Sequence, residues 1–216
     1  MTIRPDRHST TVKGVALPPV ILVHGIFRDH GVMRQLRRAL EAAGRRVLTP
    51  DLRPADGTVG ILELAGQLEG YLREQLAPGE RCDLIGHSMG GLVARTYVQC
   101  CDGEERVRRL VTLAAPHQGT LMAWFWPGRG VRDMRPGSPF LRKLAREVGR
   151  LERVRVVSVW TPYDMIIVPP ESSALPVGEN VCVRLAHHRA FLSSRRLAKR
   201  IVGWIGKEGK EEESRK

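Results

Sequence analysis

Short runs of apolar residues alternate along the chain with segments whose apolar residues recur at helical spacing. The runs, which are typical of strands buried on both faces of a sheet, lie at 19–24, 47–49, 107–113, 154–160, 181–185 and immediately before Gly86. The segments with helical spacing lie at 33–43, 59–76, 140–148, after Ser88, and after His188 through 205. Because strands and helices alternate, we predict an α/β fold with a mostly parallel sheet of about six strands and helices on both faces.

The length of 216 residues suits a single domain. We expect this domain to span 18–205, with a polar arm at 1–17 before it and a charged, disordered tail at 206–216 after it. The stretch 117–139 is rich in Gly, Pro and Trp and shows no clear period, so we expect at most a small cap there.

One short motif indicates a chemistry. Gly86-His87-Ser88-Met89-Gly90 stands between a buried apolar run and a helix-like segment, which is the sequence signature of a nucleophile elbow. In such a turn the strand and the helix come so close that only glycine fits two residues before and two residues after the serine. The serine hydroxyl then stands exposed above the sheet, at the N-terminus of the following helix. An ordinary strand-to-helix turn is the alternative interpretation.

Further candidate residues follow other predicted strands. Gly25-Ile26 comes after the first apolar run, Asp164 after the run at 154–160, and His188 after the last run. In a parallel sheet the carboxyl ends of the strands lie at one edge, and functional residues collect there. We therefore expect these residues to meet Ser88 at that edge.

These motifs, in this order, resemble the α/β-hydrolases of the lipase and esterase branch, in particular small bacterial lipases and inositol-deacylase-like lipases. The resemblance covers residues 18–205 and depends on His24-Gly25, the elbow, Leu113-Ala114-Ala115-Pro116-His117-Gln118-Gly119-Thr120, and the late Asp and His. The order Ser, Asp, His along the chain is that of the fold. The resemblance implies a serine hydrolase acting on carboxylic esters, with no cofactor. Some lipases of this kind use a calcium ion, but the sequence shows no ligand cluster for one, so we expect no metal.

By this resemblance Ser88 is the nucleophile, His188 the base, and Asp164 the group that orients the histidine. His188 precedes the apolar Phe191 and Leu192 by three and four residues, and this spacing places it over the buried face of the last helix. The neighbouring His187 is the alternative base.

The resemblance also implies an oxyanion hole formed by the backbone N–H groups of Ile26 and Met89. This chain lacks a run of glycines at that point, because Phe27 and Arg28 stand there. The acyl pocket beside the hole should differ accordingly. His117 lies in a Pro-His-x-Gly-Thr segment that related chains carry as a turn, so we expect it to be structural.

Large aromatic residues provide candidates for substrate binding: Phe27, Trp124, Phe125 and Trp126. Three adjacent aromatics cannot all face one core, so at least one of the last three should contact solvent, substrate or lipid. Our hypothesis is a small cap that lines an apolar acyl site. The alternative is a loop that simply packs on the sheet.

The chain carries a net charge of +12, and 29 of its 35 basic residues are arginine. This charge would suit transient contact with an anionic membrane surface, but the arginines are spread over the chain, which favours solvated helix faces. No nucleic-acid partner is expected. The N-terminal residues do not resemble a signal peptide and no run of about 18 apolar residues is present, so we expect a cytoplasmic protein. The four cysteines lack metal-ligand spacing and should be reduced.

We therefore expect a serine hydrolase that cleaves carboxylic esters of apolar or lipid-like acyl groups through an acyl-enzyme intermediate. One alternative is an acyltransferase that uses the same triad but delivers the acyl group to an alcohol or thiol. Another is a non-catalytic, lipase-like module that binds anionic membrane surfaces. The presence of Ser88, Asp164 and His188 together favours an enzyme, because binding alone does not need all three.

Overall fold

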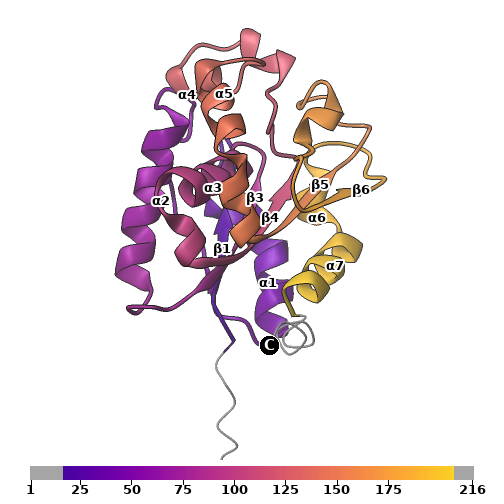
Figure 1. Ribbon diagram of the computed structural model, residues 1–216. Helices are drawn as coiled ribbons and strands as arrows, with labels where there is room; N and C mark the ends of the chain where they lie inside the picture. Colours follow the sequence, from indigo (N-terminus) through magenta and orange to yellow (C-terminus); the bar gives the residue numbers. More distant parts are fainter. Residues whose placement is uncertain (1–16, 207–216) are drawn as a thin grey trace, which may run out of the picture.

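The computed structural model describes residues 17–206. The predicted arm at 1–17 and tail at 206–216 lie outside this range, except for the residue at the inner end of each. Within it, the predicted α/β fold with a six-stranded parallel sheet and helices on both faces is confirmed (Figure 1).

The strands run parallel in the order β2-β1-β3-β4-β5-β6. Their bounds are β1 Val20–Val23, β2 Val47–Leu48, β3 Cys82–His87, β4 Val107–Leu113, β5 Arg155–Trp160 and β6 Glu179–Cys182. After β1 the chain first adds β2 on one side and then returns to add β3 on the other. The carboxyl ends of β1 and β3 therefore lie side by side at the point where the strand order reverses, which is where open α/β sheets bind ligands.

The helices form a layer on each face of the sheet (Figure 1). Their bounds are α1 Arg34–Ala42, α2 Ile61–Gln75, α3 Met89–Cys100, α4 Arg129–Asp133, α5 Pro139–Arg146, α6 Ala190–Ser193 and α7 Arg195–Gly206. Short 3-10 helices are η1 His30–Met33, η2 Gly103–Glu105, η3 Leu121–Trp124, η4 Val148–Arg153 and η5 Pro170–Ser173. None of the helices between residues 17 and 206 has the length and apolar character needed to cross a membrane.

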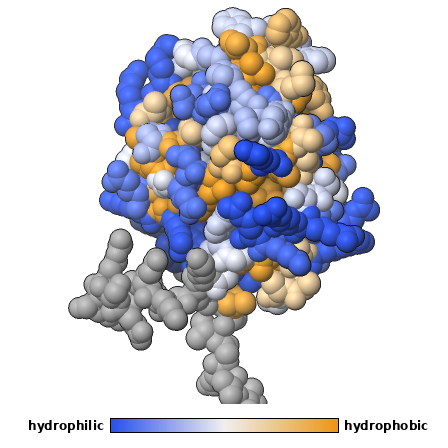
Figure 2. All heavy atoms as spheres, turned by 90° about the vertical axis from the view of Figure 1, so that its right-hand side faces the viewer, coloured by the Kyte–Doolittle hydropathy of each residue, from blue (hydrophilic) through white to orange (hydrophobic). Residues whose placement is uncertain are grey.

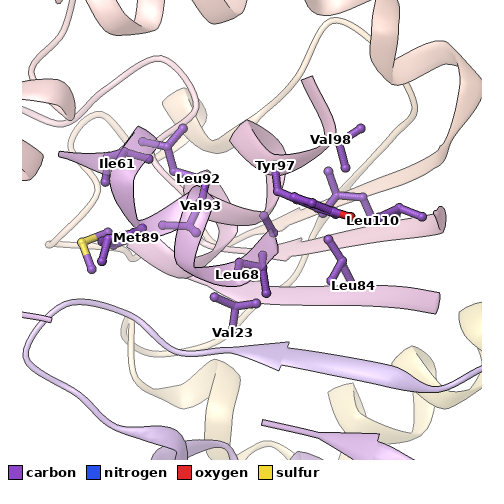
Figure 3. Packing of buried hydrophobic residues seen from close by; sticks show 14 of the residues in the cluster. Val23, Ile61, Leu68, Leu84, Met89, Leu92, Val93, Tyr97, Val98 and Leu110 are labelled. Atoms are coloured by element: carbon purple, nitrogen blue, oxygen red, sulfur yellow. The ribbon is translucent and has the colours of Figure 1, made fainter. Parts of the chain in front are cut away.

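The apolar core is divided into two clusters by the sheet. Successive residues of a strand point to opposite faces, so Ile21 and Val23 of β1 pack with α2 and α3, whereas Val20 and Leu22 pack with α1 and α7. All four are completely buried. Figure 3 shows the first cluster, in which Val23 lies below the side chains of α2 and α3. Burial on both faces explains why the central strands are continuous apolar runs.

The last strand begins and ends earlier than the apolar run at 181–185 predicts. β6 pairs through Glu179–Cys182, and only Val181 in it is buried. An edge strand pairs with its neighbour through backbone hydrogen bonds and needs few apolar side chains. The apolar run therefore shows which residues pack against the core, not which residues form the strand. Val183 and Leu185 continue to pack against the core beyond the strand.

The single helix predicted after His188 is divided in two. Ser194 adopts an extended conformation (φ −78°, ψ 106°) between α6 and α7, and its hydroxyl accepts a hydrogen bond from the Leu197 N–H at 3.2 Å. A serine that caps the first turn of a helix favours a new start at that position.

The irregular stretch 117–139 contains η3 and α4, which were too short to leave a period in the sequence. Two side chains anchor it to distant parts of the chain. The Thr120 hydroxyl donates to the Ile166 carbonyl oxygen at 2.7 Å, and the Asp133 carboxylate accepts from the Ile61 N–H at 2.9 Å. The stretch is therefore tied both to the loop after β5 and to the N-terminus of α2.

Candidate active site

Ser88 occupies a strained turn between β3 and α3. Its backbone has φ 56° and ψ −127°, a conformation that is costly for a residue other than glycine. The flanking glycines permit the turn. A Cβ atom at Gly86 would lie 2.5 Å from the Cα of Gly91, and one at Gly90 would collide with the carbonyl oxygens of Val23 and His24. The close approach expected of a nucleophile elbow is thus present.

His188 and Asp164 form a buried pair after β6 and β5. The His188 Nδ1 lies 2.7 Å from Asp164 Oδ2, and both side chains are more than nine-tenths buried. The other carboxylate oxygen accepts hydrogen bonds from the backbone N–H groups of Ile166 and Ile167, at 2.9 and 3.0 Å. Burial by itself raises the pKa of Asp164, but the hydrogen bonds from His188 and from these N–H groups outweigh it and lower the pKa below its usual value.

The two adjacent histidines have different environments. His188 is the one that contacts Asp164, whereas His187 is exposed and its imidazole forms no hydrogen bond or ion pair with a residue in 17–206. Since a carboxylate only accepts hydrogen bonds, Nδ1 of His188 carries the proton in this pair. Its Nε2 is then left with the lone pair.

Ser88, His187 and His188 line one cavity of about 1110 Å³ at the carboxyl edge of the sheet. Gly25 brings the loop after β1 to the same place, because a Cβ atom there would lie 3.1 Å from Ser88 Cβ. The residues that follow β1, β3 and β6 therefore lie together at one edge of the sheet, as the sequence predicted.

The candidate donors of an oxyanion hole are the backbone N–H groups of Ile26, which lines the cavity, and of Met89, which directly follows Ser88. Neither donates a hydrogen bond to any residue that the structure describes. The next N–H along the loop, that of Phe27, is occupied by the Ala55 carbonyl oxygen at 2.6 Å. Phe27 has φ 55°, so the loop after β1 is strained at this point, as the elbow is.

The aromatic candidates separate into two groups. Phe27 and Trp126 line the cavity and contact each other edge to face, with ring centroids 6.0 Å apart. Trp124 instead stacks under the guanidinium of Arg135 at 4.5 Å, and Phe125 is 75% exposed. Neither of these two is among the described residues that line the cavity, so the structure does not bring them to Ser88, and their part in substrate binding stays a prediction. Trp124 ends η3, and Phe125 and Trp126 follow it, so the three adjacent rings point in different directions. The sequence did not show which of them would line the cavity.

Two more histidines lie buried beneath the site. The His87 ring packs against that of His188, with centroids 4.7 Å apart, and its Nε2 lies 3.2 Å from the His188 carbonyl oxygen. His117 Nε2 is 2.9 Å from the Thr112 hydroxyl. Burial, reinforced by the nearby His188, lowers the pKa of His87 to about 3, and burial lowers the pKa of His117 well below its usual value. Both rings are therefore neutral at pH 7 and suited to packing.

These two histidines predict an acid-sensitive fold. Below about pH 6.5 the unfolded chain protonates both side chains while the folded chain does not, so the unfolded state binds more protons and the free energy of unfolding falls. His87 by itself should account for a loss of about 2 kcal/mol between pH 7 and pH 5, and His117 adds to it in the same direction. Urea unfolding at several pH values measures it. His117→Gln should make the slope smaller, because one of the two buried histidines is then absent. An equal slope in the unmodified protein and in His117→Gln would contradict the assignment.

Sequence reasoning missed a set of basic residues at the cavity. Arg34 and Arg38 from α1 and Arg195 and Lys199 from α7 line it. Each pair is spaced four residues apart, which puts its members on one helix face, and this spacing was the available signal. Among the described residues, no three His, Cys, Asp or Glu side chains gather as metal ligands would.

The fold and this site define the class. The chain belongs to the alpha/beta hydrolase fold family, whose model matches residues 18–140, more than half of the chain. The resemblance drawn from the sequence motifs is thereby confirmed.

Named relatives are lipases and esterases. A triacylglycerol lipase from Pseudomonas fragi is 32% identical over 122 residues, which are 51% of this chain and 40% of the relative. Esterase PIR7B from Oryza sativa subsp. japonica is 31% identical over 59% of this chain and 46% of its own length. An sn-1-specific diacylglycerol lipase, ABHD11 of Mus musculus, is 32% identical over 48% of this chain and 34% of its own length. The chain thus spans less than half the length of these relatives.

A solved structure supports the fold over nearly the whole chain. Bacillus licheniformis lipase BlEst2 in its mature form superposes with a TM-score of 0.71, covering 94% of this chain and 95% of that chain at 15% identity.

Proposed function

We propose that this protein is a serine hydrolase that cleaves carboxylic esters of apolar acyl groups through an acyl-enzyme intermediate. One observation carries the proposal: the elbow serine, Ser88, and the Asp164–His188 pair open onto the same cavity. The names of the lipase and esterase relatives support the same reaction class.

In the proposed reaction Ser88 Oγ attacks the acyl carbon while His188 Nε2 accepts its proton. The tautomer with the proton on Nδ1, bonded to Asp164, leaves Nε2 free for this task. The ionised Asp164 stabilises the imidazolium that forms. Its lowered pKa keeps it ionised at neutral pH. His188 then protonates the leaving group, and water hydrolyses the acyl-serine by the same route in reverse.

Negative charge on the carbonyl oxygen would be stabilised by the N–H groups of Ile26 and Met89. Both are free of hydrogen bonds to described residues, and the Met89 N–H lies at the N-terminus of α3. Removal of one such donor typically costs a hundredfold or more in rate, about 3 kcal/mol. These two groups therefore matter as much as the side chains, although substitution of their side chains does not remove them.

The acyl chain is proposed to lie along the apolar wall of the cavity. This wall is formed by residues of the loop after β1, of η3 and α4 and the positions just after each, and of the loop after β5: Ile26, Phe27, Met122, Trp126, Val131, Met134 and Ile166. An acyl chain buried there gains about 0.8 kcal/mol for each CH₂ removed from water.

The test is a series of nitrophenyl esters from acetate to palmitate, together with labelling by a fluorophosphonate. We expect covalent labelling of Ser88 and a higher kcat/KM for octanoate than for acetate. Trp126→Ala should reduce that preference about tenfold, because it removes part of the apolar wall. Phe125→Ala, an exposed aromatic outside the cavity, is the matched control and should behave as the unmodified protein. No labelling and no hydrolysis of any ester would overturn the proposal.

A further inference from the structure

Basic residues line the cavity at Ser88 in addition to the apolar residues described above. There are six of them, and we call them the cationic wall: Arg28, Arg34, Arg38, Arg189, Arg195 and Lys199. No aspartate or glutamate is among the described residues that line the cavity. The apolar wall described above and this cationic wall therefore share one space with the reactive serine.

The cationic wall is assembled from two ends of the chain. Arg34 and Arg38 are one turn apart on α1, and Arg195 and Lys199 are one turn apart on α7. α1 packs against both α6 and α7. The Gln35 side-chain amide donates to the Ser193 carbonyl oxygen at 2.6 Å, joining the two segments beside the cavity. Figure 2, which looks onto the side that carries α6 and α7, shows hydrophilic side chains around a patch of hydrophobic surface.

The described part of the chain, residues 17–206, provides no carboxylate partner for the charges of this wall. None of the six residues forms an ion pair with a carboxylate in the described part of the chain. The same helix provides the contrast: Arg37 on α1, which does not line the cavity, pairs with Glu41 at 2.7 Å. Arg34 and Arg38, which do line it, form no such pair with a residue in 17–206.

Uncompensated like charges on the wall of a cleft repel one another and attract anions into it. Guanidinium groups bind phosphate with two parallel hydrogen bonds, and several cations together suit a group with more than one negative charge. We propose that the cavity takes acyl esters or thioesters whose leaving group carries phosphate, the acyl chain lying on the apolar wall and the phosphate on the cationic wall. This inference rests on the ester hydrolysis proposed above.

The chemical step is unchanged by the phosphate. Ser88 Oγ forms a bond to the acyl carbon, and the bond from that carbon to the oxygen or sulfur of the leaving group breaks. The hydroxyl proton passes through His188 to the departing atom. Water then adds to the acyl-serine, regenerates the hydroxyl and releases the carboxylic acid. The phosphate remains on the leaving group and takes no part in bond making.

Two substrates that differ only in phosphate test the proposal. Octanoyl glycerol and octanoyl glycerol 3-phosphate have the same acyl chain and the same ester, so the ratio of their kcat/KM values isolates the effect of the phosphate. Octanoyl-coenzyme A forms a third arm, which distinguishes a soluble phosphate-bearing carrier from a lipid headgroup. All three are measured below the concentration at which they form micelles.

The test variant is Arg34→Gln combined with Arg38→Gln and Lys199→Gln. The control variant removes the same charge elsewhere, at exposed residues outside the cavity: Arg146→Gln, Arg153→Gln and Arg196→Gln. We expect the unmodified protein to favour at least one phosphate-bearing substrate over octanoyl glycerol by about tenfold. The test variant should lose most of that preference, and the control variant should keep it. Added salt should weaken it as well, because it screens exposed charges.

The outcomes separate this inference from the proposed function. If the unmodified protein prefers octanoyl glycerol 3-phosphate and the test variant loses this preference, the phosphate belongs to a lipid headgroup. If the preference lost by the test variant is for octanoyl-coenzyme A, the phosphate belongs to a soluble carrier. Hydrolysis of octanoyl glycerol with no preference for either phosphate-bearing compound would overturn the inference and leave the ester hydrolase standing. A preference that the test variant and the control variant lose equally would also overturn it. No hydrolysis of any compound would contradict the proposed function itself.

Discussion

Ser88→Ala is expected to lower kcat/KM for nitrophenyl esters at least about a thousandfold. His188→Ala should cost about as much, because a nucleophile and its base act as one unit and removal of either disables both. The double variant should be no worse than either single one. Parallel measurement of fluorophosphonate labelling shows whether the loss lies in the attack by the serine.

The neighbouring histidine is the matched control for this experiment. His187 is exposed at the same cavity but does not contact Asp164, whereas His188 Nδ1 lies 2.7 Å from the Asp164 carboxylate. His187→Ala should therefore change kcat/KM less than about threefold. A large loss with His187→Ala and a small one with His188→Ala would assign the base to His187 and leave the Asp164–His188 pair a structural role. Activity that survives Ser88→Ala would contradict the assigned nucleophile.

Asp83→Asn is expected to lower the free energy of unfolding by about 3–5 kcal/mol. Asp83 is completely buried near the start of β3, and its carboxylate lies 2.6 Å from the guanidinium of Arg45. Arg45 is also buried and donates at 3.0 Å to the carbonyl oxygen of Ile205 at the end of α7. Loss of the carboxylate charge leaves a buried arginine without its counter-ion, which costs far more than the loss of a surface pair.

Urea unfolding measures this effect, and Asp51→Asn provides the comparison. Asp51 pairs with Arg53 in a partly exposed position, with 35% of its side chain accessible, so its loss should cost less than about 1 kcal/mol. Arg109 also lies 3.6 Å from the Asp83 carboxylate. Replacing all three residues of this buried cluster, by Asp83→Leu with Arg45→Met and Arg109→Met, should give a protein more stable than Asp83→Asn alone. A cost below 1 kcal/mol for Asp83→Asn would show that the pair does not stabilise the fold.

Asp83 and Ser88 also illustrate how position along one strand separates stability from chemistry. Both belong to the segment around β3, but Asp83 lies near its amino end and Ser88 directly after its carboxyl end. In a parallel sheet only the carboxyl end faces the ligand-binding edge. The buried carboxylate of Asp83 is therefore expected to affect unfolding, and that of Asp164 the reaction.

Local sequence was sufficient for features that depend on neighbouring residues. The elbow follows from Gly86 and Gly90, because steric exclusion at a tight turn requires glycine regardless of the rest of the fold. The central strands follow from continuous apolar runs, since both faces of the sheet are covered. Their alternation with helices was enough to predict that Asp164 and His188 would come to the edge where Ser88 lies.

Tertiary structure alone decided which of several similar residues meet. His187 and His188 differ by one position, and only the packing of the segment after β6 turns His188 toward Asp164. Trp126 lines the cavity, whereas Trp124, two positions earlier, stacks against Arg135. The cationic wall joins α1 to α7, where Gln35 and Ser193 meet across 158 positions of sequence. Which side chains of two helices meet depends on how the helices pack against each other. The sequence of either helix alone does not determine that packing.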